Sequence, residues 1–225
     1  MRRRGFVAGT VAVAVGVATV ALAAPVSVPN GGFEEGTFAK WDRFERGDGD
    51  WNIYEADPPR GIGPIVPAPP EGEFAALVTQ GGPGVNILHR VLKLKRSAVN
   101  KLKFQLYYDN SNDRFHSPKN FKFGGGGILP RARGGGGGDP NQQLRVDLMK
   151  PKAKIRSLKG KDILATLLWT KPGDPLQRPY KAVRANMTKL GINAKRVRLR
   201  IAEVDNQGEF LVGVDALEQT ARPKN

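Results

Sequence analysis

Short runs of alternating apolar and polar residues recur through most of the chain. In the clearest run, Leu102, Phe104, Leu106 and Tyr108 alternate with Lys101, Lys103, Gln105 and Tyr107. Successive side chains of a strand point to opposite faces, so such runs predict half-buried β-strands. The same reasoning predicts strands at 74–79, 85–94, 144–148, 163–169, 197–201 and 209–217. With an opening strand over 30–38, the chain has eight or more.

The boundaries of these runs favour an all-β fold. Gly, Pro, Asn and Asp separate the apolar runs, and no strong helical period competes with the alternation. Many short strands of this kind are typical of two facing antiparallel sheets. We therefore predict an all-β sandwich.

Residues 1–24 have the pattern of a secretory signal peptide. Arginines at positions 2–4 precede an apolar run, and Ala21-Leu22-Ala23 fits the small-x-small cleavage rule. The mature chain is expected to begin near Ala24 or Pro25 and to be secreted or held at the cell envelope. A membrane anchor is the alternative, because the run is about long enough to span a bilayer. Arg3-Arg4-Gly5-Phe6-Val7 also resembles the twin-arginine export motif.

The remaining residues, 25–225, suffice for one sandwich domain and would be cramped for two. The chain has no cysteine, so disulfides and thiolate metal sites are excluded and a packed core must supply the stability. Residues 57–70 hold six prolines and predict a surface loop. Residues 124–138 hold nine glycines and predict a flexible insertion. We expect a monomer with no membrane span in the mature chain and no nucleic-acid partner.

The two ends of the mature chain carry its most distinctive motifs. Asn30-Gly31-Gly32-Phe33-Glu34, with Trp41 soon after, and Phe210 to Leu217 resemble the first and last strands of galactose-binding-like jelly rolls. Many extracellular carbohydrate-binding modules have this fold. The resemblance implies a jelly-roll sandwich that binds glycans without catalysis. The Gly-rich and Pro-rich segments and the basic charge are not typical of that group.

The resemblance also implies a structural Ca²⁺ that ties the first strand to the last. The matching ligand positions are Glu34 and Asp215, and hard cations prefer such oxygen ligands. The alternative is that both are ordinary exposed carboxylates. Asp109 to Asp113 also places oxygen ligands at alternate positions, but Arg114 and Asn120 occupy positions where a calcium loop needs Gly and an acid. That segment is predicted to be a solvated loop.

Sugar binding requires flat aromatic faces beside hydrogen-bonding groups. Trp51, Tyr54 and Trp169 lie next to polar or loop residues, so we predict them as stacking platforms, with packing in the core as the alternative for each. Trp41 is predicted to belong to the core.

The charge supports a second functional hypothesis. The formal net charge is +15; without the three signal arginines, 33 Lys and Arg remain against 21 Asp and Glu, or +12. Arg196, Arg198 and Arg200 are predicted to share one outward strand face, and residues 150–161 form a second basic cluster. These groups suit an anionic polymer such as an acidic polysaccharide, a teichoic-type polymer or a membrane surface.

A glycan-acting enzyme is the third hypothesis. The chain holds only two histidines, His89 and His116, and no Gly-x-Ser-x-Gly or His-Glu-x-x-His pattern. A paired-carboxylate mechanism remains open, but nothing in the sequence selects a pair. We therefore predict a non-catalytic protein.

Overall fold

The computed structural model of the protein describes residues 24–26, 28–55, 66–110, 115, 123 and 141–223. Every regular element in these segments is a strand: β1 (Ala24–Val26), β2 (Asp42–Gly47), β3 (Asp50–Glu55), β4 (Phe74–Gln80), β5 (Gly84–Lys93), β6 (Ala98–Asn110), β7 (Gln143–Met149), β8 (Ile163–Trp169), β9 (Gln177–Asn186), β10 (Arg196–Asp205) and β11 (Phe210–Pro223). Within the same segments, no helix is long and apolar enough to cross a membrane. The predicted signal peptide, Gly-rich insertion and His116, and most of the predicted Pro-rich loop, lie outside them.

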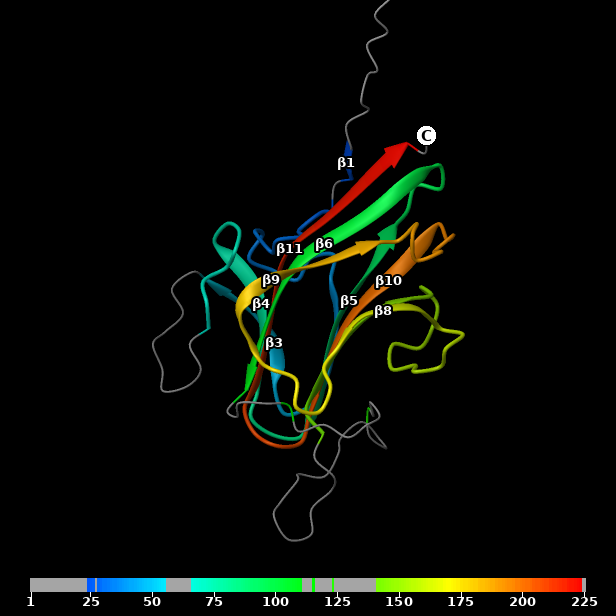
Figure 1. Ribbon diagram of the computed structural model, residues 1–225. Coiled ribbons are helices and arrows are strands. Elements are labelled where there is room, and N and C mark those ends of the chain that lie inside the picture. The colour runs from blue at the N-terminus through cyan, green and yellow to red at the C-terminus, as the bar shows by residue number, and fades with distance from the viewer. Residues whose placement is uncertain are drawn as a thin grey trace, which may run out of the picture.

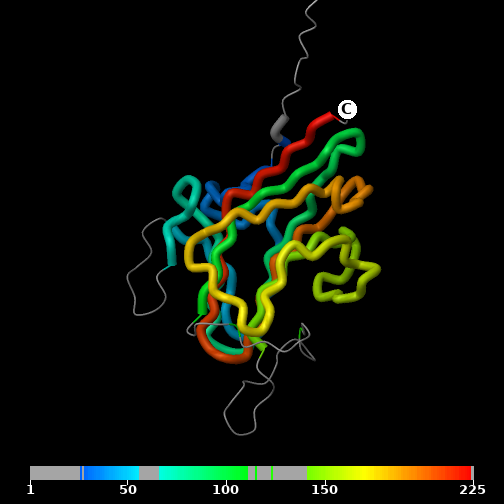
Figure 2. Tube along the Cα trace, in the orientation of Figure 1, coloured from blue at the N-terminus to red at the C-terminus, as the bar shows by residue number. Residues whose placement is uncertain are grey.

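The strands form two antiparallel sheets that face each other (Figure 1). Sheet A has the order β3-β4-β11-β6-β9, and β1 also pairs with β11. Sheet B has the order β2-β5-β10-β7-β8. The long strands β6 and β11 run side by side for most of their length (Figure 2). The predicted all-β sandwich of two antiparallel sheets is confirmed.

The core lies between the inner faces of the two sheets. In β6, Leu102, Phe104 and Leu106 are buried, and in β10 Leu199 and Ile201 are buried, as the alternation predicts. Interdigitation of two such faces is the expected packing of an aligned sandwich. The residues between them point outward and form the outer faces, where a ligand could bind.

The segment before β2 differs from its predicted strand. Residues 29–41 form a series of turns, and Asn30 and Phe33 have positive φ angles of 50° and 63°. The rings of Phe33 and Trp41 stack at a centroid distance of 5.1 Å, and both residues are buried. The opening motif is therefore a packed turn that closes the sandwich, and Trp41 belongs to the core as predicted.

One end of the sandwich interior is polar. Gln80 Nε2 donates to the carbonyls of Gly82 and Asp205, at 2.7 and 3.2 Å. Asn86 Nδ2 donates to Gln80 Oε1 at 2.9 Å, and Glu203 lies directly opposite Asn86 on the neighbouring strand. These side chains are almost completely buried. They join the loops at this end of the two sheets.

Candidate functional site

Glu34 and Asp215 lie together at the edge of sheet A, where the turn segment meets β11. A Cβ atom built on Gly32 would lie 3.5 Å from Asp215 Oδ1 and 3.7 Å from Glu34 Oε1. The two carboxylates therefore flank the same small space beside Gly32. They are 181 positions apart in the sequence, and only the folded chain brings them together.

Backbone amides hold both carboxylates in place. Glu34 Oε2 accepts a hydrogen bond from the Glu73 amide at 3.0 Å. Asp215 Oδ2 accepts one from the Glu71 amide at 3.2 Å, and its Oδ1 one from Ala216 at 2.6 Å. Burial raises the pKa of Asp215 to about 7, opposed by the two amides and reinforced by the negative charges of Glu34 and Glu71. Asp215 is therefore close to half-protonated at neutral pH.

The backbone around these carboxylates is strained. Ala216 has a φ of 51°, next to a bulge where β11 shifts register between Asp215 and Glu218. Gly72 has a φ of 63°, and a Cβ there would lie 2.2 Å from the Glu34 carboxylate. Residues in sparsely populated φ regions cost of order 1–3 kcal/mol each and often mark functional sites. Ala216 is such a residue, and it lies directly beside Asp215.

The chemistry of this edge fits a hard cation in part. Ca²⁺ takes six to eight oxygen ligands, and Glu34 and Asp215 supply carboxylate oxygens of the right kind. Among the residues that the structure describes, no three or more Asp, Glu, His or Cys side chains converge as a metal site. Backbone carbonyls or water would have to complete any Ca²⁺ shell here.

The predicted stacking residues lie in three different environments. Trp51 is fully buried, because it points from β3 into the sandwich, so it cannot stack on a ligand in this conformation. Trp169 is half-buried, and its Nε1 donates to Gln143 Oε1 at 2.7 Å. Lys171 Nζ lies 2.8 Å from the centroid of the Trp169 ring and covers one of its faces. Neither indole offers an open platform.

Tyr54 belongs to a cluster of three tyrosines on the outer face of sheet A. Its Oη lies 2.8 Å from Tyr180 Oη, and the rings of Tyr180 and Tyr107 are 5.7 Å apart. Gly213 lies beneath them, and a Cβ there would come within 2.3 Å of Tyr180 Oη. Burial raises the pKa of Tyr54 to about 12, so its hydroxyl keeps its proton at physiological pH. Tyr54, Tyr107 and Tyr180 are called the tyrosine cluster below.

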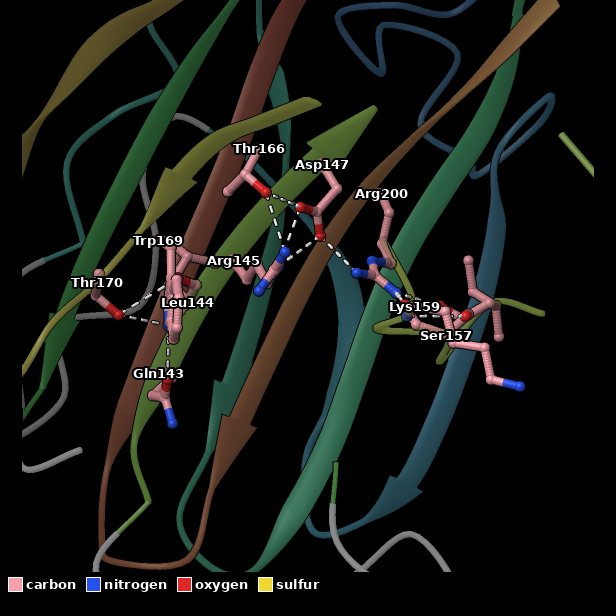
Figure 3. Close-up of polar contacts among 11 residues, drawn as sticks. Gln143, Leu144, Arg145, Asp147, Ser157, Lys159, Thr166, Trp169, Thr170 and Arg200 are labelled. Atoms are coloured by element: carbon pink, nitrogen blue, oxygen red, sulfur yellow. Dashed lines mark hydrogen bonds and ion pairs between the residues drawn. The ribbon is translucent and has the colours of Figure 1, made fainter. Parts of the chain in front are cut away.

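Arg200 lies on the predicted outer face of its strand, but it is not exposed. Arg200 is fully buried, and its Nη2 lies 2.5 Å from Asp147 Oδ2 (Figure 3). Arg145 Nε pairs with the same carboxylate at 2.9 Å, and Thr166 Oγ1 donates to it at 2.7 Å. Desolvation lowers the pKa of Arg200, opposed by the charge of Asp147. This carboxylate and its partners form a buried network on the outer face of sheet B.

Arg200 is buried because the connection between β7 and β8 covers it. Residues 150–162 fold over the outer face of β10, and Arg200 Nη1 donates to the carbonyls of Ile155 and Ser157 at 2.6 and 2.9 Å. Arg198 Nη1 donates to the Ala153 carbonyl at 2.7 Å. The alternation predicts the correct face but not the segment that covers it. Of the three arginines, only Arg196 is exposed.

A pocket of about 440 Å³ lies on the outer face of sheet A, farther along the strands from the tyrosine cluster. It is called the basic pocket below, and its walls are Lys101, Leu102, Lys103, Arg184, Ala185, Asn186, Lys189, Glu218 and Thr220. These residues come from β6, β9 and β11 and from the turn after β9. The polar positions of β6 were visible in the sequence, but β9 was not predicted as a strand. Its position opposite β6 could therefore not be foreseen.

A second pocket, of about 570 Å³, lies beside β1 and β5. Its Trp41 ring is covered by the Arg90 guanidinium, 4.8 Å from the ring centroid. Arg90 Nη1 in turn donates to the Pro29 carbonyl at 3.1 Å. Trp41 and Arg90 of this pocket thus serve the packing of the turn segment.

No protein-family model and no curated protein sequence matches the chain. Among solved structures, TmCBM61 in complex with β-1,4-galactotriose is similar at 12% identity, covering 88% of this chain and 97% of that chain, with a TM-score of 0.49. A Stig cyclase, Fisc from Fischerella sp. TAU, is similar at 16% identity, covering 91% and 100%, with a TM-score of 0.49. The K3 adhesin domain of Lys-gingipain from Porphyromonas gingivalis is similar at 14% identity, covering 88% and 98%, with a TM-score of 0.43. The likeness is to β-sandwich proteins with different activities, and at this level it carries no argument about function.

Proposed function

We infer that the protein binds an extracellular or cell-envelope glycan, without catalysis, on the outer face of sheet A. The observation that carries this proposal is the basic pocket. It is about 440 Å³ in volume and presents amide, hydroxyl, ammonium, guanidinium and carboxylate groups on one sheet face. Sugars are recognised through a few well-placed polar groups of this kind. The motifs at both ends of the chain, which resemble carbohydrate-binding modules, support the same function.

The tyrosine cluster extends this surface along β6. Tyr107 lies four residues from Lys103 on the same strand, a separation of about 13 Å. Tyr54 and Tyr180 are half-buried, and their hydroxyls bond to each other, so they present no broad stacking face. Hydrogen bonding therefore carries more of the proposed recognition than stacking does.

One structural Ca²⁺ at Glu34 and Asp215 is part of this proposal. The cation would neutralise two carboxylates that flank one space and would fasten the turn segment to β11. Its role would be to hold the edge of sheet A in place. It would not touch the glycan at the basic pocket, since neither carboxylate lines that pocket.

A steric substitution tests the proposed surface. Thr220→Tyr would fill part of the basic pocket from β11, and Thr79→Tyr makes the same change at an exposed position of β4 that does not line the pocket. On a glycan array, the unmodified protein and the Thr79→Tyr variant are expected to bind the same glycans, and the Thr220→Tyr variant is expected to lose at least tenfold in affinity. An array with no binding, or equal binding by both variants, would reject the proposal.

A further inference from the structure

Three cations of the basic pocket have no ion-pair partner within the part of the chain that the structure describes. The pocket holds Lys101, Lys103, Arg184 and Lys189 against one acid, Glu218, so its lining carries a net charge of +3. Glu218 pairs with Lys103, whose Nζ lies 3.0 Å from Glu218 Oε1. Lys101, Arg184 and Lys189 form no ion pair with any residue that the structure describes.

Strand pairing places these cations side by side. Lys103 is the cross-strand partner of Arg184 on β9, and Lys101 that of Asn186. Like charges directly opposite each other in a sheet are destabilising. Glu218 relieves part of that repulsion from β11, where it is the partner of Lys103 on the other side. The remaining positive charge points to an anionic ligand.

The other cations of the outer faces contrast with these three. Arg200 and Arg145 pair with Asp147, and Arg178 pairs with Asp109. Arg198 donates to backbone carbonyls of the β7–β8 connection. These arginines are engaged within the fold, whereas Lys101, Arg184 and Lys189 are exposed and line one pocket.

We propose that the basic pocket recognises an acidic polysaccharide, one that carries carboxylate or sulfate groups. This inference rests on the glycan binding proposed above and names the class of glycan. Arg184 offers a planar guanidinium that matches a carboxylate or sulfate with paired hydrogen bonds, and the lysines add positive point charges. Asn186 and Thr220 in the same pocket suit uncharged sugar hydroxyls. No aromatic residue lines the pocket, which disfavours single-stranded nucleic acid, because its binders stack bases on aromatic rings.

A matched pair of charge-neutralising variants tests the inference. Lys101→Gln, Arg184→Gln and Lys189→Gln together remove the three unpaired cations. Lys152→Gln, Lys154→Gln and Lys159→Gln remove three exposed cations from the β7–β8 connection and serve as the control. Both triple variants have the same net charge, so a difference between them reports the position of the charge. The probes are polygalacturonate and its fully methyl-esterified, neutral form, measured by titration calorimetry at 50 and 200 mM salt.

The unmodified protein and the control variant are expected to bind polygalacturonate more tightly than the neutral form. By analogy with single-stranded nucleic acid, each neutralised contact adds about 0.7 to the slope with which log affinity falls against log salt concentration. For three contacts, the fourfold rise in salt is expected to lower the affinity roughly 20-fold. The pocket variant is expected to lose the preference for polygalacturonate and most of this salt dependence. Dextran sulfate and unmodified dextran repeat the test with sulfate in place of carboxylate, and success with either pair supports the inference.

Several results would overturn the inference. Tight, salt-independent binding of the neutral polymers would leave the proposed glycan binding intact and reject the acidic class. Equal losses in both triple variants would show a general charge effect with no role for the pocket. Binding to vesicles of phosphatidylserine and phosphatidylcholine that only the pocket variant loses, without binding to either acidic polymer, would assign the pocket to a membrane surface. No binding to any of the polysaccharides, neutral or acidic, would remove the proposed function along with the inference.

Discussion

Replacing Glu203 by glutamine tests whether the sandwich interior holds a neutral carboxyl group. Glu203 is fully buried, and among the described residues neither of its side-chain oxygens has a hydrogen-bond partner. Asn86, directly opposite on β5, donates its amide nitrogen to Gln80 and Asp48, and its Oδ1 is also without a partner. All three unpartnered atoms are acceptors when Glu203 is ionised. A proton on Glu203 would convert one of them into a donor toward Asn86.

The titration of Glu203 makes the stability of the protein depend on pH. Burial raises the pKa of Glu203 well above its ordinary value, and the charge of Asp205 raises it further. The folded state therefore keeps a proton that the unfolded chain releases above pH 4.5 or so. Its contribution to stability is complete below that pH and declines as the pH rises toward the folded pKa, by about 1.4 kcal/mol per pH unit. Stability is therefore expected to fall as the pH rises from 5 to 7.

Glutamine has no such proton to lose, and its amide can donate to Asn86 Oδ1. The stability of the Glu203→Gln variant relative to that of the unmodified protein is therefore expected to rise with pH. A domain of this size changes its melting temperature by about 2–4 °C per kcal/mol, so a difference of about 1 kcal/mol between the two pH values is large enough to measure. Melting curves at pH 5, 6, 7 and 8 measure it, with Glu55→Gln at an exposed position as the control. A pH-independent difference between variant and unmodified protein, or one that also appears in the control, would refute the reasoning.

Two further predictions concern other buried charges. Arg200→Met would leave Asp147 buried with one cation fewer, which is expected to cost about 3–5 kcal/mol in urea unfolding, whereas Arg196→Met at an exposed position is expected to change little; equal stability of the two variants would contradict the buried pair. Added Ca²⁺ is expected to raise the melting temperature more at pH 8 than at pH 6, because Asp215, with a pKa of about 7, must lose its proton to become a ligand. An equal shift at both pH values, or no shift, would argue against the calcium proposal.

The sequence predicts the central strands well and the peripheral strands poorly. The predicted strands over 85–94 and 144–148 match the central strands β5 and β7 to within one residue at each end, and the alternation around Phe104 correctly identifies the inner face of β6. Among the edge strands, β8 is the exception, because the predicted strand over 163–169 has its bounds. The signals of the central strands come from burial, which imposes a period of two wherever a strand has one buried face. β2 and β9 lie at sheet edges and are mostly exposed or half-buried, so their sequences carry little of that period. They were not predicted as strands.

The residues of the candidate site could be predicted only where they belong to a sequence motif. Glu34 and Asp215 were singled out by their places in the two terminal motifs, and the structure does place them on either side of Gly32. No local pattern indicates that Trp51 points inward or that a distant connection covers Arg200. Such facts depend on which segments pack against a strand. The basic pocket escaped prediction for the same reason, because two of its cations come from β9 and the turn after it.

The distribution of charge suggests that the arginines of sheet B and the cations of sheet A have different roles. On sheet B, the β7–β8 connection lies over the outer face, and its carbonyls and Asp147 satisfy Arg198 and Arg200. Burying those arginines costs desolvation energy, which is recovered only while every partner stays in place, so this face has little freedom to bind a ligand. On sheet A, Lys101 and Arg184 keep their charges exposed beside a pocket, and desolvating them is a cost that a bound anion could offset. Arg198 and Arg200 of sheet B thus have a structural role, whereas exposed cations line a pocket on sheet A, which is why the proposed recognition is assigned to sheet A.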